Sequence, residues 1–215
     1  MSSIFVYVVD RDFGFAPNPF HGVCTLATCK PRIRRAATTG DWVIGMGGNR
    51  LNATGRCIFA MRVTRKIDFN TYWAEMEYRD KKPVRNGSQK MMVGDNIYHS
   101  VGDKWIQLDS HHSYPDGKQN DHNVINDTSQ DSVLISDHFY YFGKSPIEIP
   151  VVVLSELGYR NGRNHRRFEP IKCESLLKII AQSAPINTVL ADPHDFESAH
   201  ARYSRGNNKI VKVHS

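Results

Sequence analysis

The sequence predicts an α+β fold, in which helices flank a curved mixed or antiparallel sheet that approaches a barrel. Three observations support this fold class. The chain has 215 residues, of which 40% are hydrophobic, enough for the core of one sizeable domain. Its apolar runs are short and rich in β-branched and aromatic residues, as strands are. The predicted strands and helices follow one another without the regular alternation of a parallel α/β protein.

The first predicted strand and the first predicted helix are separated by a loop. Residues 4–9, IFVYVV, are a compact apolar run and predict a central strand. Residues 14–22 hold two prolines and two glycines, which excludes a helix there. A short helix is expected next, with Thr28 as its N-cap, Pro31 in its first turn and Gly40 beyond its end.

Two more strands and a second helix are expected before residue 80. Residues 41–48, DWVIGMGG, and 55–63, GRCIFAMRV, are strand-like, and glycines in the former let another group approach the backbone. After Asp68 the spacing of the apolar residues changes to that of a helix, and Asp68 is expected to be its N-cap. The apolar positions of this helix are Phe69, Tyr72, Trp73 and Met76.

A long polar insertion is expected at residues 80–131, where turn-forming residues separate short apolar pieces. Regular structure then resumes with two strands, at 133–143 and 147–154. An amphipathic helix follows at 173–183. The insertion is therefore expected to be an addition to a folded core.

The whole chain, residues 1–215, is expected to form one domain, with its core at 4–79 and 132–200. A basic loop at 161–167 and a basic tail at 202–215 contribute to a net charge of +6. This charge favours an acidic partner, and nucleotides or nucleic acids come first among these.

The cysteines indicate a reducing compartment. None of Cys24, Cys29, Cys57 and Cys173 forms a C-x-x-C pair, and their spacing fits neither a zinc ribbon nor a disulfide framework. Free thiols are typical of the cytoplasm, where we expect this protein. The first apolar run is too short for a signal peptide or a membrane span. Neither a Walker sequence nor a G-x-G-x-x-G after a strand occurs.

Longer motifs carry a resemblance to a known family. Residues 5–48, FVYVVDRDFGFAPNPFHGVCTLATCKPRIRRAATTGDWVIGMGG, resemble the opening of the family called nucleotide modification associated domain 2. GDNIYH, SHHSYPDGKQNDHNVINDT and VLISDHFYYFGKSPIEIP fit the same family. The resemblance covers roughly residues 4–170. It implies a role in modifying nucleobases, often in phage and bacterial conflict systems, beside partner proteins of such a system.

A weaker resemblance concerns the fold. The order of strand, GV loop, basic helix and GD turn looks like that of PUA and EVE-type domains, which bind a modified base in a pocket beside that loop. EVE domains usually carry arginine and asparagine after GV, where this chain has Cys24 and Thr25. The ligand-binding residues implied here are Asn18, Phe20, His21, Gly22, Val23, Cys24 and Thr25, with His122 from a later loop.

The stretch 111–128, HHSYPDGKQNDHNVINDT, carries the most chemistry. Its side chains could converge on a metal ion, but no spacing matches a known metal motif, so we predict neither a metal site nor a cofactor. The alternatives are a hydrogen-bonded surface loop and an ordered lid whose side chains contact the ligand. The family resemblance favours the lid. The length of the insertion supports the same choice, because a long insertion in a compact domain is usually functional or disordered.

An enzyme is the alternative to a pure binding protein. It would use a histidine as general base and an aspartate to orient that base. The candidates are His111 and His112 for the base, and Asp116 and Asp127 for its partner. A cysteine near a histidine can also be a nucleophile, which makes Cys24, close to His21, and Cys29 candidates. The competing interpretation is that both cysteines fill a tight junction as small apolar residues.

Basic clusters are candidates for phosphate contacts, against the alternative of a solvated face. The clusters comprise Arg32, Arg34, Arg35, Arg160, Arg163, Arg166 and Arg167. Of these, the predicted phosphate-binding residues are Arg32, Arg35, Arg163, Arg166 and Arg167. We therefore predict a protein that binds a nucleotide or nucleobase near residues 12–25, with the 109–128 loop closing over the ligand. A third class, a protein-interaction subunit without a small-molecule site, would show no saturable nucleotide binding.

Overall fold

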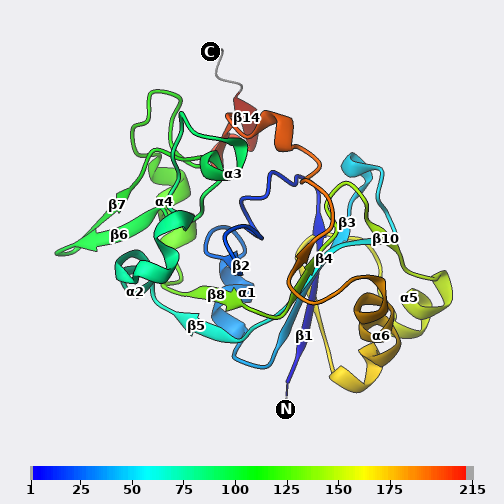
Figure 1. Ribbon diagram of the computed structural model, residues 1–215. Coiled ribbons are helices and arrows are strands. Elements are labelled where there is room, and N and C mark those ends of the chain that lie inside the picture. Colours follow the sequence, from blue (N-terminus) through cyan, green and yellow to red (C-terminus); the bar gives the residue numbers. More distant parts are fainter. Residues whose placement is uncertain (1, 212–215) are drawn as a thin grey trace.

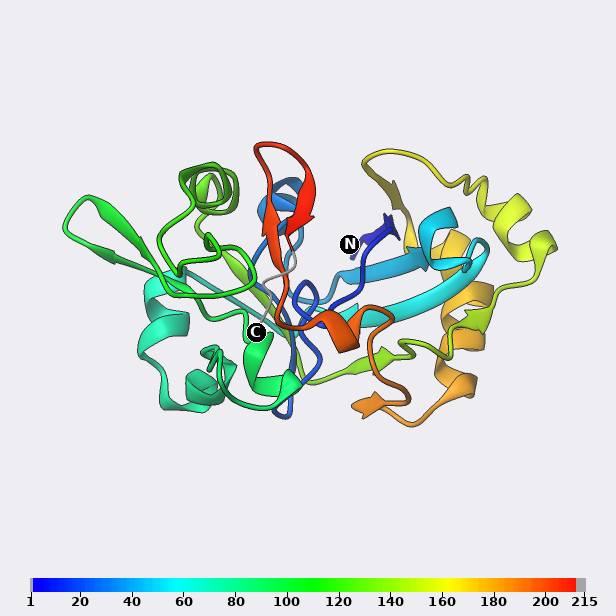
Figure 2. The same cartoon turned by 90° about the horizontal axis from the view of Figure 1, so that it is seen from above.

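The computed structural model describes residues 2–211 and has the mixed α+β architecture that the sequence predicts (Figure 1). Residues 212–215, the end of the predicted basic tail and of the short strand expected in it, lie outside the described residues. A large sheet forms one half of the molecule, and a smaller sheet with a helical lobe forms the other half (Figures 1 and 2).

The large sheet is built from seven strands, which are β1 (Ile4–Val9), β3 (Trp42–Gly47), β4 (Arg56–Arg62), β9 (Phe139–Tyr141), β10 (Ile147–Glu148), β11 (His165–Phe168) and β12 (Thr188–Val189). Six of them follow the order β11-β1-β3-β4-β9-β12, and β10 pairs with β4. β1 is parallel to β3 and β9 to β12, whereas the other pairs are antiparallel. The mixed character that the sequence predicts is therefore confirmed.

The predicted barrel is wrong for the described residues, because β11 and β12 remain open edges of the sheet. The apolar run at 133–143 is shared between two sheets instead of closing one. β8 (Val133–Ser136) pairs with β2 (Cys24–Leu26) and β5 (Arg65–Ile67), whereas β9 pairs with β4. The chain turns between β8 and β9, where the Ser136 hydroxyl donates to the His138 carbonyl at 2.8 Å.

The core between the two sheets fixes how they face each other. Phe5 of β1 and Val43 of β3 pack there with Leu26 and Leu134 of the small sheet. The short helix α1 (Pro31–Ala36) contributes Ile33 to the same core. Thr28 is not its N-cap: Lys30 occupies that position, and no side chain caps the helix.

Two helices cover the other face of the large sheet, α5 (Val151–Leu157) and α6 (Glu174–Ser183), with the 3-10 turn η3 (Pro170–Cys173) before α6 (Figure 1). The strand predicted at 147–154 is therefore correct only for β10. Pro150 has no N–H for a ladder, and it stands at the N-cap of α5. The basic loop predicted at 161–167 is likewise partly wrong, since His165–Phe168 pairs with β1.

The predicted polar insertion forms most of a lobe with its own aromatic core. Its elements are α2 (Phe69–Ala74), η2 (Met76–Lys81), α3 (Gln89–Met92), β6 (Tyr98–Val101), β7 (Lys104–Gln107) and α4 (Asp121–Thr128). Asp68 caps α2 as predicted, because its carboxylate accepts from the Thr71 N–H at 2.8 Å. The single helix expected after Asp68 breaks into two at Glu75.

A buried polar network ties this lobe to the loop after β1. Lys81 is 1% exposed, and its ammonium donates to the Asn18 side chain at 2.8 Å and to the Val23 carbonyl at 2.7 Å. Burial lowers the pKa of Lys81 to about 8. Asp95 accepts from the Thr25 hydroxyl at 2.7 Å. Residues near 18–25 are therefore structural supports of the junction between lobe and sheet.

The remaining elements are η1 (Asn49–Leu51), η4 (Phe196–Ser198) and a hairpin of β13 (Arg202–Ser204) and β14 (Lys209–Val211). Figure 2 shows the red hairpin standing between the green lobe and the large sheet. Within residues 2–211, no helix combines the length and apolar character needed to cross a membrane.

Truncation of the α6 core contact should be costly. Ile180 is 0% exposed and packs against the large sheet, so Ile180→Ala should lower the free energy of unfolding by about 2–5 kcal/mol. Ile171→Ala is the matched control, because that side chain is 68% exposed. Urea unfolding followed by circular dichroism measures both, and equal effects would contradict the packing described here.

Candidate active site

A cleft of about 1150 Å³ opens at the carboxyl ends of the parallel strands β1 and β3. Residues just after β1 and β3 form its floor, and the loop before α1 forms one side. The other walls come from the 161–165 loop, from His111 and His112, and from the β13–β14 hairpin. The cleft therefore joins the large sheet, the lobe and the C-terminal hairpin.

The cleft lining is strongly basic. Its five cationic side chains face one aspartate, Asp10, among the lining residues that the structure describes. These cations are Arg11, Lys30, Arg32, Arg163 and Arg205. Amide side chains add uncharged hydrogen-bonding groups, including Asn49 and Asn161. Such a lining suits an anionic ligand that carries phosphate.

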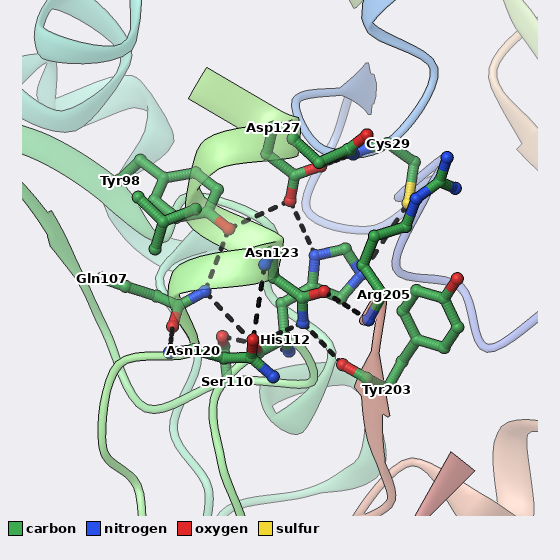
Figure 3. Close-up of polar contacts among 12 residues, drawn as sticks. Cys29, Tyr98, Gln107, Ser110, His112, Asn120, Asn123, Asp127, Tyr203 and Arg205 are labelled. Carbon is green, nitrogen blue, oxygen red and sulfur yellow. Dashed lines mark hydrogen bonds and ion pairs between the residues drawn. The ribbon is translucent and has the colours of Figure 1, made fainter. Parts of the chain in front are cut away.

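Three side chains meet in series at one side of this cleft (Figure 3). The Cys29 Sγ lies 3.7 Å from the Nε2 of His112. The Nδ1 of the same ring lies 2.7 Å from the Oδ2 of Asp127. His112 and Asp127 are buried, while Cys29 is partly exposed and lines the cleft. A thiol, an imidazole and a carboxylate in this order form the arrangement of a cysteine nucleophile with its base and orienting group.

The Asp127 carboxylate holds the cluster together. Its Oδ1 accepts from the Cys29 backbone N–H at 2.8 Å and from the Asn126 amide at 3.0 Å. Its Oδ2 accepts from the Tyr98 hydroxyl at 3.0 Å, beside the His112 contact. Gln107 donates to the Tyr98 hydroxyl in turn at 2.9 Å (Figure 3). Both oxygens of this buried carboxylate are therefore fully engaged.

The backbone at the cysteine has an unusual conformation. Cys29 and Lys30 have φ angles of 57° and 38°, in the left-handed region that non-glycine residues rarely adopt. The Cys29 N–H is held by Asp127, and the Cys29 carbonyl accepts from the Arg34 Nε at 2.9 Å. Arg34 is 0% exposed and also donates to the backbone carbonyls of Asp127, Gln130 and Ser132. Such strain persists only where the surroundings fix it, and it clusters at functional sites.

The protonation of His112 follows from these contacts. Burial alone lowers the pKa of His112, but the Asp127 carboxylate and Cys29 raise it to about 10. Burial favours protonation of Asp127, yet the adjacent His112 holds the pKa of this carboxyl below its usual value. An ion pair of imidazolium and carboxylate results. His111 differs, because burial and the charge of His112 lower its pKa well below the usual value.

The same three residues could also be considered as metal ligands, since their donor atoms lie within 4.8 Å of one another. The ring of His112 stands between the other two groups, with one nitrogen toward Cys29 and the other toward Asp127. A metal site would need all three donors to converge on one point and would use one nitrogen of the ring. The serial geometry therefore favours proton transfer over metal binding.

The structure separates the four candidate acid–base residues. It brings His112 and Asp127 together, and it leaves His111 against the cleft with its Nδ1 2.7 Å from the Ala201 carbonyl. Asp116 lies exposed in a turn, where it pairs with Lys118 at 2.8 Å. The candidate ligand residue His122 is exposed on α4 and is not among the residues that line the cleft.

The seven residues implied by the EVE-type resemblance do not line the cleft. Asn18, Phe20, Cys24 and Thr25 are buried, His21 and Gly22 are exposed, and Val23 is intermediate. The Phe20 ring stacks on Phe196 at 5.4 Å, and burial raises the pKa of the Cys24 thiol to about 12. Their upstream neighbours Phe13, Phe15 and Ala16 do line it.

Only some of the predicted phosphate-binding arginines line the cleft. Arg32 and Arg163 line the cleft, whereas Arg35 bonds Gln130 at 3.1 Å. Arg166 is exposed on β11, and Arg167 donates to the Ser3 hydroxyl at 2.8 Å. Among the lining residues that sequence reasoning missed are Tyr7, Arg11, Lys30 and Arg205. The predicted basic tail was the one signal that pointed to Arg205.

The fold and site define an α+β protein with a basic cleft and, at its side, a Cys–His–Asp cluster whose histidine and aspartate are buried. The chain matches nucleotide modification associated domain 2 over residues 1–200, and it belongs to that family. The family resemblance read from the motifs is confirmed, and the match extends beyond the residues 4–170 expected. No curated protein and no solved structure matches the chain, so the PUA and EVE-type resemblance has no support from them.

Removal of the Asp127 charge should destabilise the protein and lower the pKa of His112. Asp127→Asn should lower the free energy of unfolding by roughly 3 kcal/mol, because it breaks a buried ion pair. NMR titration should show the pKa of His112 falling well below about 10, because burial, which lowers it, then acts without the main opposing charge. Asp116→Asn is the control, since that carboxylate is exposed.

The stability difference between the wild type and Asp127→Asn should depend on pH. The folded pKa of His112 is raised, so its contribution is complete below about pH 6.5 and is lost as the pH rises toward about 10. The folded pKa of Asp127 is lowered, so its contribution is present above about pH 3.9 and is lost as the pH falls further. A difference that is constant from pH 6 to 10 would contradict the ion pair.

Proposed function

We propose that this protein is an enzyme that modifies nucleotides, or nucleobases within nucleic acid, through nucleophilic attack by Cys29. One observation carries the proposal: the cysteine, histidine and aspartate stand in series beside a basic cleft. Membership of a nucleotide modification family supports the choice of substrate class. Binding of the nucleotide remains part of this proposal, because the enzyme must hold its substrate before it reacts.

Each member of the cluster has a role set by its neighbours. An imidazolium beside a thiol favours the thiolate, the form in which cysteine attacks. His112 then donates a proton to the leaving group and accepts one from the second reactant. Asp127 orients the ring and stabilises its charge, as its 2.7 Å contact allows. The other cysteines, Cys24, Cys57 and Cys173, are buried and take no part.

The cleft offers separate surfaces for phosphate and base. Arg11 and Arg205 line it as permanent cations that suit phosphate oxygens. Tyr203 presents a ring that contacts both Arg11 and His112, with centroid distances of 5.5 Å in each case. Phe13 and Phe15 also line the cleft and pack against His111. Aromatic side chains and two arginines in one cleft suit a base with its phosphate.

Cys29 should be the one fast-reacting thiol. Iodoacetamide should alkylate Cys29 before the buried cysteines, and His112→Ala should slow this reaction by about tenfold or more because the imidazolium is lost. Peptide mass spectrometry after timed quenching identifies the modified residue. Cys29→Ala should abolish turnover on a panel of nucleotides and oligonucleotides, yet retain their binding in thermal-shift measurements. Full turnover by Cys29→Ala would exclude the proposed mechanism.

The basic lining should determine ligand affinity. The double variant Arg11→Ala, Arg205→Ala should weaken nucleotide binding by roughly 3–6 kcal/mol, since the loss of each guanidinium removes a charge-assisted contact worth about 1.5–3 kcal/mol. Arg62→Ala is the matched control, because that arginine is exposed at the end of β4, away from the cleft lining. Isothermal titration calorimetry at two salt concentrations measures both. Equal losses in the two variants would place the ligand elsewhere.

A further inference from the structure

A tyrosine of β1 lines the same cleft as Cys29, and its hydroxyl makes no hydrogen bond within the described residues. Tyr7 is 2% exposed and lines the cleft, as Cys29 and Lys30 do. Its hydroxyl is buried and has no hydrogen-bond partner among the described residues. A buried hydroxyl without a partner is costly to a folded protein, and native proteins rarely keep one unless a ligand or water completes it.

The surroundings of this hydroxyl keep it protonated, so that it can donate a hydrogen bond. Burial, and next the negative charge of a Cys29 thiolate when that form is present, raise the pKa of Tyr7 well above its usual value. The Lys30 ammonium lies 4.4 Å from the centroid of the Tyr7 ring, so a cation stands close by. The left-handed backbone at Lys30 sets the direction in which its side chain leaves the main chain. Tyr7 and Lys30 therefore bring a hydroxyl and an ammonium group to the cleft that Cys29 also lines, and Lys30 directly follows Cys29 in the chain.

We propose that Tyr7 and Lys30 form an oxyanion-binding site beside Cys29, and that the reaction of this enzyme is acyl transfer. The substrate class is a nucleotide or nucleobase that carries or receives an acyl group through an ester or amide bond. The inference rests on the proposed function, because it needs Cys29 as the nucleophile. Donors aimed at an oxygen where negative charge develops are usually the largest contribution to such catalysis.

The steps balance without an oxidant or reductant. The Cys29 thiolate attacks the acyl carbon, a C–S bond forms, and the carbonyl electron pair moves onto the oxygen held by Tyr7 and Lys30. Collapse of this intermediate breaks the bond to the leaving alcohol or amine, which takes a proton from His112 and leaves a thioester. Water or an amine then attacks the thioester and gives its proton to His112, and the acyl product departs from the regenerated thiolate.

Two small reagents separate the oxyanion site from the thiolate itself. 4-Nitrophenyl acetate acylates a thiolate through a tetrahedral oxyanion, whereas iodoacetamide alkylates it without one. Tyr7→Phe should lower the rate of Cys29 acylation relative to alkylation by roughly tenfold or more. The melting temperature should not fall, because the hydroxyl that is removed makes no hydrogen bond within the described chain. Lys30→Met should lower the same ratio, and Lys30→Arg should restore much of it.

Tyr159→Phe is the matched control. Its hydroxyl is also buried without a partner in the described residues, but Tyr159 does not line the cleft. Its ratio of acylation to alkylation should equal that of the wild type. A wild-type ratio in Tyr7→Phe, or an equal fall in both rates, would overturn the oxyanion site. Failure of both reagents to modify Cys29 in the wild type would instead overturn the proposed function.

Discussion

The buried carboxylate of Asp127 is the contact on which the architecture of the cleft depends. Its four donors come from the loop before α1, from the stretch after β7, from β6 and from α4. The lobe could not dock on the sheet with this charge unpaired, since a buried charge without partners costs several kcal/mol. Arg34 completes the junction. Its guanidinium donates to the Cys29 carbonyl and to three carbonyls at and beyond the end of α4, those of Asp127, Gln130 and Ser132. Cys29 is therefore positioned by the same bonds that join the two halves.

The elements that the sequence predicts well are those with strong local signals. Residues 174–183 form the helix expected at 173–183, because its apolar stripe and the following proline both act locally. Asp68 caps its helix through its own side chain. In contrast, DHNVINDT has few good helix formers, and α4 is held by tertiary bonds: the Asn123 amide donates to the carbonyls of His112 and Tyr203 at 2.6 Å each.

The site is harder to predict for a related reason. Cys29 and His112 are 83 residues apart in the chain, so no motif spacing links them. Sequence reasoning could name His112 and Asp127 as one pair among several, because residue type alone did not distinguish them from His111 and Asp116. Burial decides between them: Asp127 is 0% exposed in the junction, while Asp116 stays in a solvent-exposed turn. The left-handed backbone at Cys29 and Lys30 follows from contacts that only the folded chain provides.

The wall of the cleft and the Cys–His–Asp cluster come from different parts of the chain. Tyr203, Arg205 and Asn208 form the outer wall of the cleft, yet they lie beyond residue 200, where the family match ends. Cys29, His112 and Asp127 all lie inside the matched region. The hairpin docks through backbone bonds, such as the Tyr203 N–H to the His111 carbonyl at 2.7 Å, and through Arg202, which pairs with Asp109 at 2.6 Å. A change at Arg205 or Asn208 would therefore alter the wall of the cleft, while Cys29, His112 and Asp127 keep their own contacts.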